Sequence, residues 1–272
     1  MLRHDRYSRQ GFLGDHSIFS RATIGLIGLG GGGSVILTQL AHIGFENFVG
    51  YDPNLKIEEK HLNRTLGVSH EDLGATVPKV ANARRIVERL QPNARPLFIH
   101  DRWQSDPTPL RSCDIVFGCV DGFSEREQLE LFCRRHLIPY IDIGLGVKIG
   151  SADLTPVLAG QVILSMPGQA CMKCIGFLNE AKLAQEAQEY GDAGINPQVI
   201  WGNMALASAA VGIATKLLTG WAGETALRHP VYLQYDGNQD VVQPHQRLEY
   251  LDRSPCPHFP SEAVGAHILR SI

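Results

Sequence analysis

A glycine-rich stretch near the start of the chain constrains the fold more than any other feature. Residues Thr23 to Asp52 begin with an apolar run that ends in Gly28-Leu29-Gly30-Gly31-Gly32-Gly33. Apolar residues at helical spacing follow, and then a second apolar run, Asn47 to Tyr51, ends on Asp52. This order of strand, glycine turn, helix, strand and acid is typical of a mononucleotide-binding βαβ unit.

The glycines and the acid in this stretch suit the two ends of a nucleotide. The glycines of this run allow backbone N–H groups to approach phosphates at a helix N-terminus, where the helix dipole favours anions. Asp52 follows Gly28 by 24 residues, where a carboxylate accepts a hydrogen bond from a ribose hydroxyl. A turn that only packs a helix on a sheet is the alternative. Strand, spacing and acid together favour a nucleotide site, without naming the nucleotide.

Length, charge and cysteine content narrow the class of protein. The 272 residues suffice for one large α/β domain, and a net charge of −3 gives no basic footprint for nucleic acid. No apolar run reaches the roughly 20 residues that span a bilayer, and the charged N-terminus lacks a signal-peptide pattern. Six cysteines, two of them in a Cys-x-x-Cys pair, indicate reduced thiols and a metal. We therefore expect a cytoplasmic protein that makes no contact with membranes.

The chain alternates strand and helix patterns up to residue 144 and then changes. A polar stretch from Pro53 to Pro78 is followed by predicted helices and strands. They are a helix from Pro78 to Leu90, strands at Ala94–His100 and Asp114–Asp121, a helix capped by Ser124, and a strand at Ile138–Ile143. Alternation of this kind predicts a parallel sheet with right-handed crossovers.

The second half of the chain reads differently. Antiparallel strands are predicted at Val147–Ser151 and Gly160–Ser165, followed by a helix rich in small residues, Asn203–Leu218, and by final strands at Pro230–Tyr235 and Val241–Leu248. The fold class is therefore α/β: a Rossmann-like, doubly wound, mostly parallel sheet that antiparallel strands extend in the C-terminal half. We expect one domain over residues 1–272, with the nucleotide-binding half at about residues 20–145.

Three further polar positions suggest the chemistry. Asp121 directly follows an apolar strand, where a carboxylate can hold Mg²⁺ that bridges phosphate oxygens. A dehydrogenase has no use for this acid, although capping of the next turn would also explain it. Asn63-Arg64 and Lys79 lie in and after the polar stretch, and such cations neutralise a polyphosphate and its departing pyrophosphate. Each taken singly reads as ordinary surface charge; together with the glycine turn they favour a nucleoside triphosphate site.

These motifs resemble those of the ubiquitin-activating superfamily, in its bacterial MoeB, ThiF and HesA branch. The motifs in register are Arg6-Tyr7-Ser8-Arg9-Gln10, the glycine run, Asp52, Leu62-Asn63-Arg64, Pro78-Lys79 and Cys119-Val120-Asp121. The likeness covers nearly the whole chain. It implies that ATP adenylates the C-terminal glycine carboxylate of a small ubiquitin-like or sulfur-carrier protein and that pyrophosphate leaves.

The resemblance also implies a role for each matching residue. Gly28, Gly30, Gly31 and Gly33 would cradle the nucleotide and Asp52 its ribose. Asn63, Arg64 and Lys79 would bind the triphosphate, and Asp121 would bind Mg²⁺. Arg9 matches an arginine that reaches the partner subunit's active site, so a homodimer is implied. Residues from about 146 to 272 would form the dimer and carrier-binding half.

The chain departs from the family pattern at several positions. His61 and Thr65 flank the retained Asn63 and Arg64, Asn54 stands where a second acid is common, and Gly122 replaces an asparagine.

The family's zinc site uses two Cys-x-x-Cys pairs, of which Cys171 and Cys174 form the first. In the second, Cys256 remains and Phe259 replaces the last cysteine, so His258 would have to supply the fourth zinc ligand. A vestigial site that binds no metal is the alternative. Residues 179–202 contain no cysteine, which predicts adenylation without a thioester in that loop; Cys113, Cys119 and Cys133 are expected to be packing residues.

Four other functions are alternatives to adenylation of a carrier protein. A related branch adenylates a carboxylate on modified tRNA, and a peptide carboxylate is a further acceptor; the few Lys and Arg of the C-terminal third disfavour RNA. An NAD-dependent oxidoreductase would leave Arg64, Lys79 and Asp121 without a role. A non-catalytic scaffold would have no need to retain that set.

Overall fold

The computed structural model describes residues 7–148, 155–188, 197–223, 227, 230–251 and 255–259. Within these ranges one mixed sheet holds the molecule together, with the strand order β3-β2-β1-β4-β5-β6-β7-β8. The strands are β1 (Thr23–Ile27), β2 (Asn47–Tyr51), β3 (Arg95–Ile99), β4 (Ile115–Gly118), β5 (Tyr140–Lys148), β6 (Val157–Ser165), β7 (Val231–Asp236) and β8 (Val241–Pro244).

The first five strands run parallel, as the alternating pattern predicts. Ile24 of β1 pairs with Phe48 on one side and with Ile115 on the other, so β1 lies between β2 and β4. The chain order reverses between these two neighbours, and open α/β sheets bind ligands at such a switch point. The expected α/β class and the Rossmann-like arrangement are confirmed.

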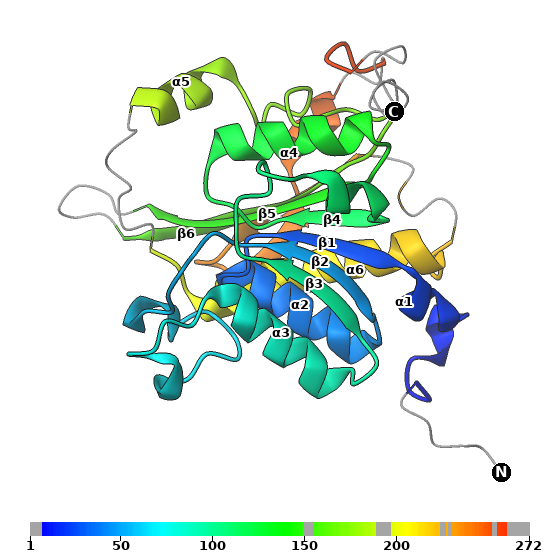
Figure 1. The fold of residues 1–272 in the computed structure, drawn as a ribbon. Helices are drawn as coiled ribbons and strands as arrows, with labels where there is room; N and C mark the ends of the chain where they lie inside the picture. The colour runs from blue at the N-terminus through cyan, green and yellow to red at the C-terminus, as the bar shows by residue number, and fades with distance from the viewer. Residues whose placement is uncertain are drawn as a thin grey trace.

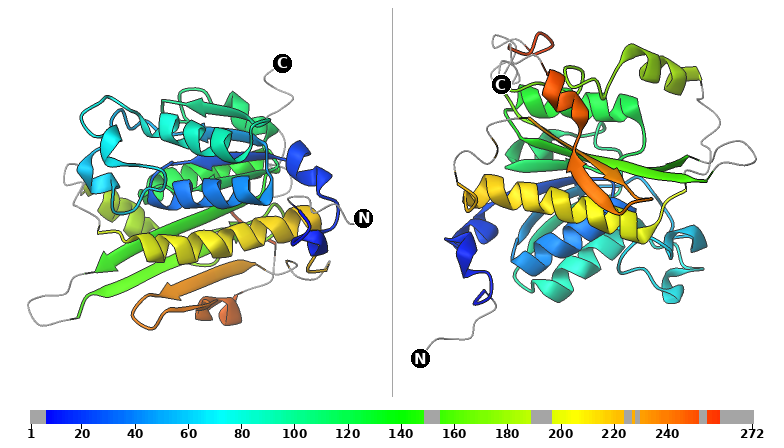
Figure 2. Two further views of the ribbon diagram at one scale, coloured as in Figure 1. Left: turned by 90° about the horizontal axis from the view of Figure 1, so that it is seen from below. Right: turned by 180° about the vertical axis from the view of Figure 1, so that it is seen from behind.

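Helices cover both faces of the sheet (Figures 1 and 2). The α-helices are α1 (Ser17–Arg21), α2 (Gly31–Ile43), α3 (Lys79–Leu90), α4 (Phe123–Arg135), α5 (Glu180–Gln188) and α6 (Ile200–Thr219). Short 3₁₀ helices occur at η1 (Gly11–Leu13), η2 (Glu59–His61), η3 (His70–Asp72), η4 (Thr108–Ser112) and η5 (Gln246–Tyr250). Helices α2, α3 and α6 lie together on one face, and α4 covers the other with α5 beside it (Figure 1).

Two hydrophobic clusters follow from this layering. The larger one joins α2 and α6 to the sheet, with Leu26, Leu37 and Leu206 fully buried in it. The other lies under α4, where Val116, Leu129 and other apolar residues pack together. The small residues of α6 let it lie close to α2, which explains their frequency in the sequence.

The C-terminal half differs in detail from the sequence-based expectation. Strands β5 to β8 are antiparallel to one another, as expected, but β5 continues without a break from Tyr140 to Lys148. The expected separate strand at 147–151 is therefore the end of β5, and residues 149–151 lie outside the described part. The final expected strand stops at Pro244, which cannot donate to a sheet ladder.

The N-terminus of α4 also differs from the expectation. Ser124 is not its cap, because the helix already begins at Phe123. The carboxylate of Glu186 on α5 takes the capping role: it accepts hydrogen bonds from the backbone N–H groups of Phe123 (3.0 Å) and Ser124 (2.7 Å). None of the helices in the described ranges is long and apolar enough to cross a bilayer.

Candidate active site and metal centre

A cavity of about 560 Å³ opens at the carboxyl ends of β1, β2 and β4. Of the residues selected from the sequence, it brings together Gly28, Gly30, Gly31, Asp52, Arg64, Lys79 and Asp121. Gly33, Asn63 and Arg9 do not line it. The volume is within the range of small-molecule sites.

The physical reason for a glycine differs from one position of the turn to the next. Gly28 has a φ of +87°, and a Cβ there would stand 2.5 Å from the carbonyl oxygen of Cys119. A Cβ on Gly33 would stand 1.9 Å from the oxygen of Gly28, so Gly33 lets the turn close against the helix. At Gly30 the nearest atom to a Cβ is Lys79 Nζ, 3.7 Å away. Gly30 is thus the position where the backbone faces the cavity.

Asp52 is buried at the centre of this turn. Its Oδ2 accepts a hydrogen bond from the N–H of Leu29 (2.8 Å), and its Oδ1 accepts one from the N–H of Asn54 (2.9 Å). Lys79 Nζ lies 4.0 Å from Oδ2. The carboxylate therefore fixes the end of β2 to the glycine turn and places the ammonium group of Lys79 beside both.

Arg64 lies at the rim of the cavity. Its Nη1 donates to the carbonyl oxygen of Lys60 (2.5 Å) and to Oδ1 of Asn63 (3.2 Å). Asn63, exposed and outside the cavity wall, thus contacts the guanidinium group of Arg64 and not the cavity.

His61 is buried near Lys79 and Arg64. In the sequence it stood out only as a departure from the family motif. Its Nδ1 accepts a hydrogen bond from the N–H of Glu58 (2.9 Å). Burial, together with the charges of Lys79 and Arg64, lowers the pKa of His61 to about 4. The imidazole is therefore neutral at physiological pH and adds no third positive charge.

Asp121 is exposed in the cavity wall. Its Oδ1 accepts a hydrogen bond from Nε2 of Gln198 (3.3 Å), which precedes α6. An exposed carboxylate is the kind of oxygen ligand that a hard divalent cation prefers. Asp121, Lys79 and Arg64 line the same cavity.

Sequence reasoning missed the wall formed by the segment after β3 and by α4. Trp103 donates from Nε1 to Oε1 of Glu125 (3.2 Å), and both line the cavity. Burial raises the pKa of the Glu125 carboxyl. Arg126 is buried, forms an ion pair with Asp142 and donates to the carbonyl oxygen of Val120. The only signal in the sequence was a charged pair, Glu125-Arg126, close behind Asp121.

Arg9 lies far from the cavity of its own chain. It belongs to the turn before η1, where the ring of Tyr7 packs against Gly44 and Gln10 Nε2 donates to the carbonyl oxygen of Ile43 (2.6 Å). Both contacts are at the C-terminal end of α2, whereas the glycine turn is at its N-terminus. A helix of 13 residues separates the two ends by about 20 Å.

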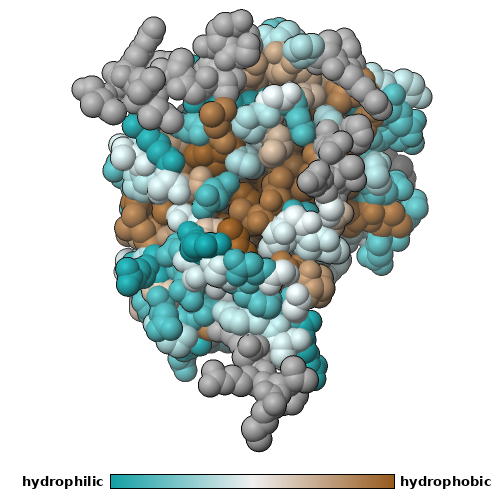
Figure 3. Space-filling view, turned by 90° about the vertical axis from the view of Figure 1, so that its right-hand side faces the viewer, coloured by the Kyte–Doolittle hydropathy of each residue, from teal (hydrophilic) through white to brown (hydrophobic). Residues whose placement is uncertain are grey.

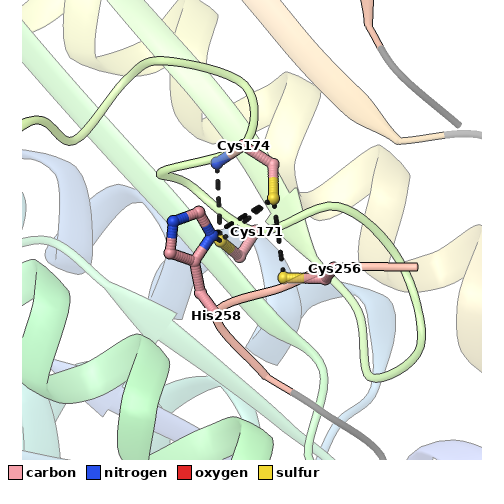
Figure 4. A group of neighbouring side chains, drawn as sticks. All are labelled: Cys171, Cys174, Cys256 and His258. Carbon is pink, nitrogen blue, oxygen red and sulfur yellow. Dashed lines mark hydrogen bonds between the residues drawn. The ribbon is translucent and has the colours of Figure 1, made fainter. Parts of the chain in front are cut away.

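Four potential metal ligands converge at one place (Figure 4). The ligand atoms of Cys171, Cys174, Cys256 and His258 all lie within 4.8 Å of one another. Cys174 Sγ is 3.6 Å from Cys171 Sγ and 3.5 Å from Cys256 Sγ. His258 Nδ1 is 3.4 Å from both Cys171 Sγ and Cys174 Sγ. Tetrahedral zinc with Zn–S bonds of about 2.3 Å separates its ligands by roughly 3.5–3.8 Å. Three thiols and an imidazole at these distances fit zinc.

The remaining cysteines differ in their surroundings. Cys113 and Cys133 are buried, and burial raises the pKa of Cys113 to about 12. Cys119 is half-buried, packs against the larger hydrophobic cluster as expected, and also lines the cavity. Burial also raises its pKa, which disfavours the thiolate that a nucleophile needs.

Comparison with known proteins identifies the family. The model of the ThiF family matches residues 12–255, which is most of the chain. The chain belongs to the ThiF family. The expected relationship to the ubiquitin-activating superfamily is thereby confirmed.

Curated members of the ThiF family share part of their length with this chain. It is 27% identical to Protein HesA of Leptolyngbya boryana over 180 residues, which cover 63% of this chain and 60% of that protein. It is 23% identical to ubiquitin-like modifier-activating enzyme 5 of Drosophila willistoni over 181 residues, covering 61% of this chain and 42% of that enzyme. The chain therefore matches less than two thirds of either relative.

Solved structures share the fold of this ThiF-family chain. MccB of E. coli in a crystal structure with ATP superposes with a TM-score of 0.73 at 17% identity, covering 93% of this chain and 73% of that one. MccB with AMPCPP and MccA gives the same values. A selenomethionine form of PaaA has a TM-score of 0.66 at 16% identity, with 88% and 81% covered.

Proposed function

We propose that this chain catalyses ATP-dependent adenylation of a carboxylate, namely the C-terminal glycine carboxylate of a small ubiquitin-like or sulfur-carrier protein. One observation carries the proposal. A single cavity gathers a glycine turn at a helix N-terminus, the buried Asp52, the cations Lys79 and Arg64, and the exposed Asp121. These are the groups that a nucleoside triphosphate with a divalent cation requires.

The chemistry needs charge stabilisation more than proton transfer. A carboxylate oxygen attacks the α-phosphorus of ATP, and the bond from that phosphorus to the bridging oxygen breaks as pyrophosphate leaves. The carboxylate is already ionised at neutral pH, so no general base is required. Lys79 and Arg64 neutralise the charge that develops on the phosphates. Asp121 would hold Mg²⁺, which would supply further positive charge for the phosphates.

The cavity also supports the choice of an adenylyltransferase over an oxidoreductase. A hydride transfer enzyme needs the glycine turn and Asp52, but a dinucleotide carries less phosphate charge than a triphosphate and gives less reason for two cations and an acid in the same cavity. Lys79 has only 14% of its side chain exposed and stands 4.0 Å from the carboxylate of Asp52. Holding this ammonium group at the turn is useful when the bound group is a polyphosphate.

The nature of the acceptor has support from β5 and from the relatives. Ile143, Gly144 and Leu145 of β5 line the cavity, so an extended C-terminal tail would reach the α-phosphate along this strand. One relative bears the name of a ubiquitin-like modifier-activating enzyme, which supports a protein acceptor. MccB was crystallised with MccA, which makes a peptide carboxylate the alternative acceptor.

We further propose that the active unit is a homodimer and that residues from about 146 to 272 contribute its dimer and carrier-binding surfaces. Arg9 is exposed, and its neighbours Tyr7 and Gln10 contact the end of α2 that lies about 20 Å from the glycine turn, so Arg9 would serve the cavity of the partner copy. Figure 3 shows hydrophobic residues across the middle of the face on the side of α1 and the C-terminal end of α6. Phe12 and Trp221 are 67% and 44% exposed, and their rings meet edge to face.

The test is ATP–pyrophosphate exchange with purified candidate acceptors that end in glycine, and with peptides as the second class. Exchange that depends on one acceptor class identifies it. Lys79→Ala and Asp121→Ala should each lower exchange by about 100-fold or more. The first removes a positive charge beside the phosphates, and the second removes the proposed Mg²⁺ ligand. Lys56→Ala, an exposed lysine outside the cavity, is the matched control and should retain full exchange. Absence of exchange with every acceptor, or full exchange by Asp121→Ala, would contradict the proposal.

A further inference from the structure

A buried ion pair on α4 lies away from the cavity and beside the four potential metal ligands. Arg134 and Glu130 have 1% and 2% of their side chains exposed, and Arg134 Nε is 3.7 Å from Glu130 Oε1. Ser165 of β6 links them: Arg134 Nε donates to Ser165 Oγ (2.9 Å), and Ser165 Oγ donates to Glu130 Oε1 (2.5 Å). Burial of two charges is costly unless their remaining groups find partners.

The remaining groups of this pair bind the loop that carries the first two cysteines. Arg134 Nη1 donates to the carbonyl oxygen of Gln169 and Nη2 donates to that of Ala170, each at 2.9 Å. Glu130 Oε1 accepts a hydrogen bond from the N–H of Met172 (2.8 Å). The backbone is therefore held on both sides of Cys171, by charged groups whose hydrogen bonds are stronger than neutral ones.

The same arginine also contacts the segment that carries the other two ligands. The ring of Phe259 lies over the guanidinium group of Arg134, with Cζ 4.9 Å from the ring centroid. Phe259 follows His258 directly and stands three residues after Cys256. Arg134 thus touches both ligand segments, which are more than 80 residues apart in the chain: one through two hydrogen bonds, the other through a cation–π contact.

Such a contact has a thermodynamic consequence for metal binding. Two distant segments must be ordered together before four ligands can surround one ion, and ordering costs conformational entropy. A group that orders both segments in advance lowers this cost and raises the affinity for the metal. Arginine suits the role because its planar fork offers two parallel donors and a face for stacking, whereas lysine offers neither.

We propose that Arg134, covered by Phe259, is the positioning residue of the metal centre. Phe259, where the resemblance led us to expect a fourth cysteine, then has a function of its own: His258 supplies the ligand, and Phe259 fixes the segment on Arg134. Arg134 does not coordinate the ion. This inference concerns the Cys171, Cys174, Cys256 and His258 site and is independent of the adenylation activity.

The test compares zinc retention in the full-length wild-type chain, Phe259→Leu, Phe259→Cys and Phe12→Leu. Zinc transfer to a chromogenic chelator gives the affinity, and the absorption of the cobalt-substituted chain reports the number of thiolate ligands. Phe259→Leu should weaken zinc binding by about 10-fold or more, with an unchanged cobalt spectrum, because the ligands remain and their support is lost. Phe12→Leu removes an exposed aromatic contact elsewhere and should bind zinc as the wild type does.

Phe259→Cys separates positioning from ligation. If Phe259 fixes the segment, this variant loses zinc affinity although it offers an additional thiol. Tighter binding with a stronger thiolate-to-cobalt absorption would overturn the proposal, as would wild-type affinity in Phe259→Leu or a wild-type chain that binds no zinc. Arg134→Lys, which retains the charge, should lose affinity as well. Because Arg134 is buried and its variant can fail to fold, the Phe259 variants decide the matter.

Discussion

At the scale of single residues, Gly33 shows how little space the glycine turn leaves for a side chain. A Cβ at this position would stand 1.9 Å from the carbonyl oxygen of Gly28, a backbone atom that cannot move aside without opening the turn. Gly33→Ala should therefore lower the free energy of unfolding by about 3 kcal/mol and weaken ATP binding. Urea unfolding and nucleotide titration measure the two effects.

The control for this prediction is Gly212 in α6. Nothing lies within 4 Å of a Cβ built there, and its φ is not in the left-handed region. Gly212→Ala should leave ATP binding unchanged and stabilise the chain by up to about 1 kcal/mol, because alanine is the better helix former. If Gly33→Ala were as stable as Gly212→Ala, the turn would be more open than the structure indicates.

The titration of His61 should make the stability of the folded chain depend on pH. Its pKa is lowered to about 4 in the folded chain, first by burial and then by Lys79 and Arg64, against an ordinary value of 6.5. Between pH 6.5 and pH 4 the unfolded state therefore binds a proton at this site that the folded state does not. The stability contributed by the neutral His61 is present above pH 6.5 and is lost as the pH falls through this window.

Replacing His61 by asparagine isolates this effect, because asparagine can still accept the Glu58 N–H bond and does not titrate. The wild-type chain should lose more unfolding free energy than His61→Asn when the pH is lowered from 7 to 4.5, measured by urea unfolding at each pH. The comparison is between the slopes of unfolding free energy against pH, so a loss of stability from the smaller side chain that is the same at every pH cancels. Equal slopes would show that His61 titrates normally in the folded chain.

At the scale of elements, α4 connects the two candidate sites. Its first turn and the residues before it line the cavity, and its last two turns hold the loop of Cys171 through Glu130 and Arg134. Helix α5 reaches back to the beginning of α4, where Glu186 binds two backbone N–H groups. A negative charge is favoured at a helix N-terminus, so this contact stabilises the start of the helix next to Asp121.

Glu186→Ala should therefore expose the first turn of α4. The expected loss is about 1 kcal/mol of unfolding free energy. Hydrogen exchange of the Phe123 and Ser124 amides should become faster by about 10-fold, since each loses its acceptor. Glu180→Ala, in the first turn of the same α5, is the matched control and should leave both amides protected. Unchanged exchange in Glu186→Ala would mean that another group caps α4.

The sequence was sufficient where local pattern decides structure and insufficient where distant segments meet. Glycine spacing and apolar runs predicted β1, α2 and β2, because a βαβ unit is built from neighbouring residues. Trp103 and Glu125 were missed because their contact depends on how the segment after β3 crosses toward α4. Glu186 was missed for the same reason, because its partners Phe123 and Ser124 lie more than 60 residues earlier.

At the scale of the whole molecule, the position of Arg9 determines whether this arginine can reach the cavity of its own chain. The contacts of Tyr7 with Gly44 and of Gln10 with Ile43 fix this segment at the far end of α2. A flexible side chain extends far less than the length of that helix, so Arg9 has no access to its own glycine turn. If the adenylation reaction uses Arg9, a closed dimer with two-fold symmetry must bring it to the partner's cavity.

Mixing two inactive variants tests this arrangement directly. Arg9→Ala leaves its own cavity intact but offers no arginine to its partner, whereas Asp121→Ala offers the arginine but has a damaged cavity. Each variant alone should lack pyrophosphate exchange. In an equal mixture that exchanges subunits, half of the dimers combine both chains, and one of their two cavities has every group, so about a quarter of the wild-type activity should return. If Arg9→Ala alone is active, the arginine is not used, and if neither the mixture nor co-expressed chains regain exchange, no cavity is shared between copies.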